Sequence, residues 1–166
     1  MALQTELKKY SDPYGYFGEH WTNQWAEVDG ALAQQFNRTG AKIPFGRFVR
    51  KDTADGVALP SATGQRMLGV SLINKAESFL DQDEPYGYLA NEQVAILKKG
   101  EIIVYCEVPT VAYSDPVYVR HTVDGVLATI GGVSNVAGTG LDLLPNAKFA
   151  SSVVFNNRAV VSVNLP

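Results

Sequence analysis

The chain has 166 residues, of which 14 are Lys or Arg and 17 are Asp or Glu, so its formal net charge is −3. Apolar residues make up 46% and charged residues 19% of the chain, a balance typical of a globular domain rather than a disordered tail. Lys and Arg are not concentrated in either half, whereas nucleic-acid binding needs basic clusters that neutralise phosphates. Composition therefore predicts one compact domain with an appendage and no direct nucleic-acid partner.

Cys106 is the single cysteine, so an intramolecular disulfide and a cysteine-based zinc site are both excluded. The first residues, MALQTELKKY, contain no apolar segment of the kind found in signal peptides. No apolar run approaches the ~18 residues that a membrane span needs. We therefore expect synthesis in a reducing cytoplasm and no membrane partner.

Residues 1–40 are polar, rich in aromatic side chains and interrupted by Gly and Pro. Apolar residues in this segment follow a helical spacing of 3, 4 and 4 positions: Trp25, Val28, Leu32 and Phe36. Gly30 weakens such a helix by roughly 1 kcal/mol relative to Ala. We predict that residues 1–40 form an N-terminal arm with one short helix; a wholly extended arm is the competing interpretation.

Residues 41–166 contain short runs rich in Val, Ile, Tyr and Phe, separated by Gly, Pro, Asn and Asp. The predicted strands are 42–51, 57–60, 66–74, 93–99, 101–108, 117–122, 126–131, 146–156 and 158–165. Hairpin turns are expected at dipeptides that tolerate positive φ: Lys99-Gly100, Asp124-Gly125 and Asn156-Asn157. The Gly-rich stretch 131–140 is expected to be a long loop or an irregular edge strand. This pattern predicts a mainly β fold, a single compact β-sandwich or barrel domain.

No group of residues matches a known catalytic or metal-binding motif. His20 and His121 lie far apart and in no metal-ligand spacing, and we expect His121 to be a surface or half-buried strand residue. Cys106 lies in the apolar run IIVYCEV and is predicted to be a buried small hydrophobe. One acidic cluster has the carboxylates that a glycosidase needs, although a solvated loop is the simpler interpretation: Asp81, Asp83 and Glu84. We expect no catalytic residue, no metal, no cofactor and no enzymatic activity.

Aromatic side chains gather in one stretch before the β region: Tyr10, Tyr14, Tyr16, Phe17, Trp21 and Trp25. They could form a cage for a sugar or a quaternary amine, or pack onto the chain's own core. They could also dock on another protein, because aromatic residues are enriched in the cores of interfaces. We favour the third hypothesis by a small margin. The predicted protein-binding residues are Tyr14, Tyr16, Phe17, Trp21 and Trp25.

Several segments occur together in one order: IPFGRFV (43–49), MLGVSL (67–72), EQVAILKKGEIIVYCE (92–107), SDPVYVRH (114–121) and the terminal AVVSVNLP. In this order, over residues 41–166, the chain resembles the capsid cement proteins, or head decoration proteins, of tailed bacteriophages. The resemblance implies a jelly-roll-like or barrel-like β domain, with residues 92–107 as its central hairpin. The aromatic stretch 10–25 lies outside the pattern that carries the resemblance.

The resemblance also implies a function, that of a non-enzymatic structural protein of a phage head. Such a protein binds the outer surface of the capsid and cements neighbouring major capsid subunits. Its expected partners are the major capsid protein and other copies of itself, in a dimer or a trimer. Its expected location is the outside of the virion, after synthesis in the host bacterial cytoplasm. The alternative hypothesis is a carbohydrate-binding β module displayed on a virion, with the aromatic residues as its sugar face.

Overall fold

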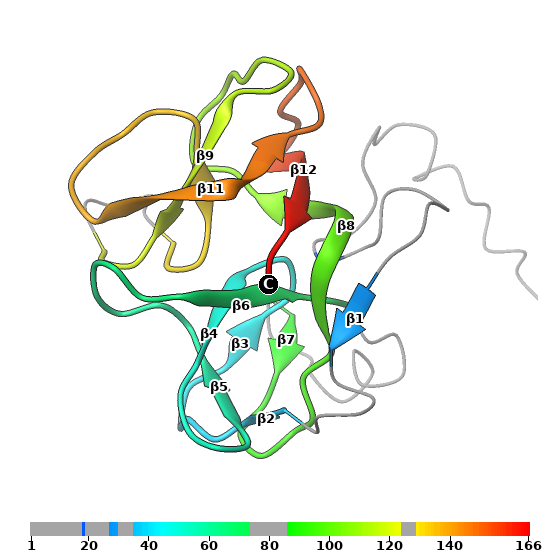
Figure 1. The fold of residues 1–166 in the computed structure, drawn as a ribbon, viewed down its shortest axis with the longest axis vertical. Helices are drawn as coiled ribbons and strands as arrows, with labels where there is room; N and C mark the ends of the chain where they lie inside the picture. Colours follow the sequence, from blue (N-terminus) through cyan, green and yellow to red (C-terminus); the bar gives the residue numbers. More distant parts are fainter. Residues whose placement is uncertain (1–17, 19–26, 30–34, 74–85, 124–128) are drawn as a thin grey trace, which may run out of the picture.

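The computed structural model describes residues 18, 27–29, 35–73, 86–123 and 129–166 (Figure 1). Within these residues the secondary structure consists of twelve strands, and no helix is present. The strands are β1 (Glu27–Asp29), β2 (Phe36–Asn37), β3 (Ile43–Pro44), β4 (Phe48–Lys51), β5 (Gly56–Ala58), β6 (Met67–Ser71), β7 (Gly87–Tyr88), β8 (Ile96–Tyr105), β9 (Pro116–Arg120), β10 (Val133–Ser134), β11 (Leu141–Phe149) and β12 (Arg158–Asn164). The predicted mainly β fold class is confirmed.

Ten strands belong to one sheet, in which the order of neighbours is β10-β9-β11-β12-β8-β6-β4-β5-β2, and β1 pairs with β8 beside this path. The strands β3 and β7 form a separate antiparallel pair. Within the large sheet every pairing is antiparallel except that of β2 with β5. Because consecutive antiparallel strands need only short connections, this topology suits a chain with many short strands and turns.

The large sheet curls so that the strands at the two ends of its order, β10 and β2, contact the segments that follow and precede β8. Beyond the end of β8, Cys106 bridges Val133 of the edge strand β10, and Glu107 N–H donates to Val133 O at 2.9 Å. Before the start of β8, Gln93 bridges Phe36 of the other edge strand, β2. Each of these edges is therefore covered by backbone, which blocks edge-to-edge aggregation. The compact β domain is consistent with the predicted sandwich or barrel.

The two larger of three apolar clusters lie on opposite faces of the strands β4, β6 and β8. Phe48, Val70 and Leu97 belong to the larger cluster, which continues into β9, β11 and β12. The neighbouring residues Val49 and Ile96 belong to the smaller cluster, with Tyr88 of β7. Successive side chains of a strand point to opposite faces, so adjacent residues serve separate cores. The central position of β8 makes it the strand on which the rest of the domain is positioned.

The predicted hairpin turn at Lys99-Gly100 is wrong, because β8 runs without interruption from Ile96 to Tyr105. Gly100 has a φ of 133° and remains paired with Val163 of β12. Glycine adopts this conformation without strain and does not need to reverse the chain. Seven consecutive pairs with β12, from Lys99 to Tyr105, favour the extended strand over a local turn. Residues 92–107 therefore form a central strand and its flanks, not the central hairpin that the resemblance implied.

The predicted short helix is also wrong in the part of it that the structure describes. Val28 lies in β1, which pairs with β8, and Phe36 lies in β2, which pairs with β5. The other two residues of the predicted helical spacing, Trp25 and Leu32, lie outside the described residues. The 3-4-4 spacing did not distinguish a helix from two short strands, because backbone pairing with distant strands decided the local conformation.

Asn156-Asn157 forms the predicted turn, and it does so because asparagine tolerates positive φ, as expected from the sequence. Both residues have positive φ, 49° and 59°, as a two-residue type I′ turn requires. The flanking Phe155 and Arg158 exchange backbone hydrogen bonds of 3.0 and 2.9 Å. The stretch 131–140 contains the edge strand β10, in agreement with the irregular-edge-strand alternative. The third predicted turn, Asp124-Gly125, lies outside the described residues.

Candidate interaction surface

The chain meets the β domain at Gly18, in the middle of the aromatic stretch. Gly18 N–H donates to Ile103 O at 2.8 Å, and Gly18 O accepts from Ile73 N–H at 3.0 Å. The residue is buried, and its φ is +75°. A β-carbon at this position would lie 2.7 Å from Ser71 O and 2.9 Å from Gly46 N, so only glycine fits. The chain therefore passes over the junction of β6 and β8 at this residue.

The residues predicted to bind a protein partner lie outside the described residues: Tyr14, Tyr16, Phe17, Trp21 and Trp25. Their role stays a prediction. The described strands β1 and β2 belong to residues 1–40 and share the large sheet with the rest of the chain. The division of the chain into residues 1–40 and 41–166 also stays a prediction.

At one end of the domain, two loops come together, and we call this surface the loop end. It comprises residues 108–114, which connect β8 to β9, and residues 150–157, which connect β11 to β12. A further loop, residues 135–140, connects β10 to β11; it begins near this end at Asn135 and finishes at the opposite end of β9, where His121 N–H donates to Gly140 O. The loops 108–114 and 150–157 lie at the top of Figure 1. Antiparallel pairing brings them to one end, because the start of β9 lies beside the end of β11, and the end of β11 lies beside β12.

Hydrogen bonds fix the loops 108–114 and 135–140 against each other. Asp115 Oδ2 accepts from Ala112 N–H and from Asn135 Nδ2, both at 2.7 Å. The Asn135 amide is the main cause that holds the pKa of Asp115 below its ordinary value, and the Ala112 N–H adds to this effect. The carboxylate therefore remains ionised, and acts as a double acceptor, well into the acidic range.

A buried ion pair holds the base of the same loops. Arg120 Nη2 lies 2.7 Å from Glu107 Oε2, and each side chain is only 9% exposed. Arg120 Nη1 also donates to Thr139 O at 3.0 Å, and Thr129 N–H donates to Glu107 Oε1 at 3.3 Å. Together these bonds tie the end of β8, the end of β9 and the segment 129–139 into one rigid unit.

A second buried cation lies close to this pair. The Arg47 guanidinium carbon lies 4.0 Å from the centre of the Tyr105 ring, an arrangement that attracts a cation to an aromatic face. Burial lowers the pKa of Arg47 to about 10, so the side chain stays charged at neutral pH. Arg47 therefore fixes the connection between β3 and β4 against the end of β8.

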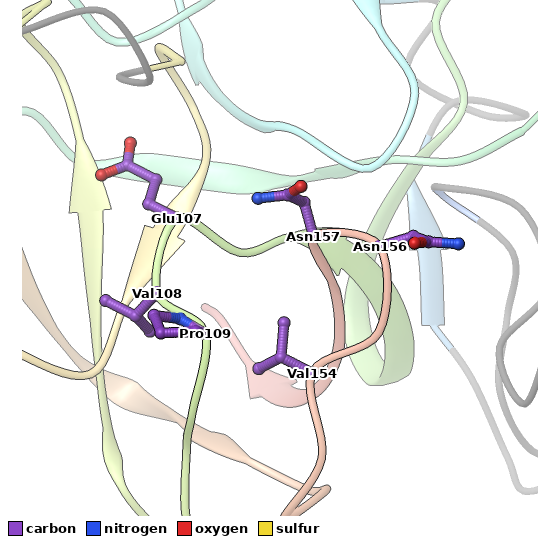
Figure 2. A pocket seen from close by; sticks show the side chains of 6 residues that line it. All are labelled: Glu107, Val108, Pro109, Val154, Asn156 and Asn157. Atoms are coloured by element: carbon purple, nitrogen blue, oxygen red, sulfur yellow. The ribbon is translucent and has the colours of Figure 1, made fainter.

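An open depression lies between the loops 108–114 and 150–157 (Figure 2). Figure 2 shows Val108 and Pro109 on one side and Val154 across from them, with the amides of Asn156 and Asn157 above. Glu107 is the one ionisable residue of its lining, and its carboxylate is occupied by Arg120. Apolar side chains and neutral amides suit contact with another surface rather than acid–base or nucleophilic chemistry.

Within the described part of the chain, the residues considered as catalytic candidates do not lie together in one site. Cys106 is fully buried, as predicted, and burial raises the pKa of its thiol to about 11. His121 is more buried than predicted, at 7% exposure, and its ring nitrogens lie 3.1 and 2.8 Å from the hydroxyls of Thr63 and Thr122. His20 and the acidic cluster Asp81, Asp83 and Glu84 lie outside the described residues.

Within the described ranges, no group of three or more His, Cys, Asp or Glu residues is placed to hold a metal ion. Over the same part of the chain, no helix has the length and apolar character needed to cross a membrane.

Sequence reasoning missed the loop end, although a signal was present. The three loops contain no Asp, Glu, Lys or Arg, whereas the whole chain has 31 such residues, 14 basic and 17 acidic. The loops are separated in sequence, so only the antiparallel topology shows that the uncharged segments 108–114 and 150–157 share one end. Three of their apolar side chains are more than half exposed: Tyr113 (73%), Val136 (61%) and Val153 (53%).

Comparison with known proteins identifies a family and a related fold. The family model described as "Structural cement protein (E217 gp24/Pam3 gp6)" matches residues 3–165. This match includes the aromatic stretch 10–25, which lay outside the resemblance seen in the sequence. A chain from a structure described as the capsid of Myoviridae phage XM1 has a TM-score of 0.69 at 19% identity, with 89% of each chain covered. No curated protein matches the chain.

Proposed function

Because the chain belongs to the family of structural cement proteins of phage capsids, we propose that it binds the outer surface of an assembled capsid and ties neighbouring major capsid subunits together. The family establishes a structural role in the phage particle. The match over residues 3–165 supports the proposal most directly, because it spans nearly the whole chain.

The physical task of a cement protein is to add interface area between subunits that internal pressure pushes apart. A rigid domain performs this task better than a flexible one, because a contact that is already ordered costs less entropy when it forms. The paired loops and the buried Arg120–Glu107 contact give the domain such rigidity. Many identical sites on a symmetric lattice then convert a modest affinity per site into strong attachment.

The aromatic residues before the β domain are proposed to contact the capsid. Gly18 supports this proposal, because its hydrogen bonds attach the middle of the aromatic stretch to the domain. Trp21 and Trp25 are the proposed anchors, since large aromatic residues dominate binding energy at interfaces.

The direct test is a binding titration on capsids that lack the protein. Purified wild-type protein should cosediment with such capsids to saturation and raise the temperature at which they release DNA. Trp25→Ala should weaken binding by roughly thirtyfold, the typical consequence of losing an interface anchor. An isolated wild-type protein that never cosediments with capsids contradicts the proposed function. Normal binding by Trp25→Ala contradicts only the role of that anchor.

A further inference from the structure

We propose that the strand β11 carries a binding site for a short extended segment of another protein, which adds to the sheet as a strand beside residues 141–144. The proposal goes beyond the proposed function, which assigns neither this surface nor this mode of binding. Strand addition needs an exposed strand edge, space beside that edge and a lining that suits the side chains of the incoming segment.

The exposed edge follows from the hydrogen-bond pattern of β11. His121 N–H donates to Gly140 O at 2.9 Å, so the backbone groups of Gly140 face β9. Backbone groups face alternate sides along an antiparallel strand, so those of Asp142 and Leu144 face β9 as well. The N–H and C=O groups of Leu143 therefore face the opposite side.

No strand of the described residues pairs with β11 on that side at Leu143. The neighbour there is β12, which pairs with β11 only over Ala147–Phe149. After the end of β12, Leu165 N–H donates to Lys98 O at 2.9 Å, so the chain follows β8 rather than β11. This internal edge differs from the end strands β10 and β2, which contact the segments that flank β8.

The edge is limited at both of its ends. Gly140, which has a φ of +73°, precedes it, and Pro145, which has no N–H to donate, follows it. Proteins use short edges and proline to prevent open-ended strand pairing. An edge of this length therefore accepts one segment of a few residues and does not promote aggregation.

An open depression lies beside the edge. The turn between β5 and β6, the strand β11 and the segment after β12 line it, with residues 63–67, 142–146, 165 and 166. Gly64 N–H donates to Asp142 Oδ2 at 2.6 Å, and Arg66 Nη2 donates to Pro166 O at 3.3 Å. These bonds fix the turn as the far wall. The site is thus formed before the segment arrives, which lowers the entropic cost of binding.

The lining favours a segment with apolar or neutral side chains. Leu143 is 55% exposed, and the buried side chains of Met67 and Leu165 also line the depression. The charged residues of the lining are one acid and one base, Asp142 and Arg66, and both are hydrogen-bonded within the domain. A charged segment would lose hydration at this site without gaining a new ion-pair partner.

The geometry also indicates why the segment comes from another protein and not from the same edge of a second copy. In every copy the β11 edge lies behind the turn that contains Gly64 and Arg66, because that turn is bonded across the depression. Two such edges cannot approach each other to the separation of about 5 Å that paired strands require. A free extended segment has no such wall beside it.

The test is an NMR titration of the full chain, labelled with ¹⁵N, with an acetylated and amidated pentapeptide, Thr-Val-Thr-Val-Thr. The Leu143 amide proton should shift to lower field and saturate at millimolar peptide, because its N–H gains an acceptor. The same peptide with every backbone nitrogen methylated keeps its side chains but loses its donors. It should bind at least roughly tenfold more weakly, as expected from the loss of one or two hydrogen bonds.

A pair of variants at one position separates the backbone from the side chain. Leu143→Pro removes the N–H that faces the depression and should abolish the saturable shifts of the neighbouring amides. It breaks no hydrogen bond to β9, and proline is tolerated where the N–H of an edge strand faces outward. Leu143→Ala is the matched control, since it keeps the N–H and should bind the peptide with less than tenfold loss.

The proposal is overturned if wild type does not bind the peptide, or if the methylated peptide binds equally well. The methylated peptide tests it without altering the protein, so the folding of Leu143→Pro does not limit the result. A Leu143 shift that grows with protein concentration alone assigns the edge to a second copy and also overturns it.

Cosedimentation with capsids distinguishes this proposal from the proposed function. Wild type that binds capsids but shows no Leu143 shift with the peptide overturns the strand-addition site alone. Wild type that binds the peptide but never cosediments with capsids contradicts the function and leaves the site supported.

Discussion

Arg120 donates to both carboxylate oxygens of Glu107, through Nε at 2.8 and 2.9 Å and through Nη2 at 2.7 Å. The two residues are thirteen positions apart, and each side chain is 9% exposed. This contact joins the end of β8 to the end of β9, at the base of the loop 108–114.

Glu107→Ala should lower the free energy of unfolding by about 3 kcal/mol, because it leaves the Arg120 guanidinium buried without its carboxylate. Denaturant titration with two optical probes measures this loss. Asp55→Ala is the control, since it removes an exposed partner of Arg38 and should change stability little. If both substitutions lowered the free energy of unfolding equally, burial would not determine how strongly the Glu107–Arg120 ion pair stabilises the protein.

Gly18→Ala should destabilise the protein by about 1–3 kcal/mol, because φ at this position is +75° and a β-carbon would meet backbone atoms of Ser71 and Gly46. Gly64→Ala is the matched control, since Gly64 has the same φ of +75° but nothing within 4 Å of its β-carbon position. The difference between the thermal unfolding midpoints of Gly18→Ala and Gly64→Ala measures the destabilisation that comes from crowding at residue 18 alone. Identical midpoints would mean that residue 18 is not packed on the domain.

Cys106 should resist alkylation in the native protein at pH 7 to 8. Its thiol is fully buried, and burial raises its pKa to about 11, so the reactive thiolate is scarce. Mass spectrometry after iodoacetamide treatment should find no adduct without denaturant and complete modification in denaturant. Rapid native labelling would contradict the placement of Cys106 in the core.

Asp115 should contribute to a loss of stability in acid. Its pKa is lower in the folded than in the unfolded protein, so its contribution is complete above the ordinary value of 3.8 and disappears as the pH falls through the folded value. The stability difference between wild type and Asp115→Asn should therefore shrink from pH 6 to pH 2.5, as measured by urea titration. A difference that is constant over this range would argue against the hydrogen bonds from Asn135 and Ala112.

Local sequence decided those features that depend on a few neighbouring residues. Asn156-Asn157 turns the chain because asparagine tolerates the positive φ that both residues adopt. Cys106 is buried because it continues an apolar run, and the frequent turn residues and β-branched residues determine the mainly β class. The family resemblance was likewise visible in short segments taken in order.

Tertiary structure decided features for which two local conformations have similar energies. Lys99-Gly100 could turn or continue, and pairing with β12 selected the continuous strand. Val28 and Phe36 could lie on a helix, and pairing with β8 and β5 placed them in strands. The loop end exists only because antiparallel pairing brings together two uncharged segments, 108–114 and 150–157, that are distant in sequence. Composition determined that these segments lack charge, whereas sheet topology determined that they form one surface.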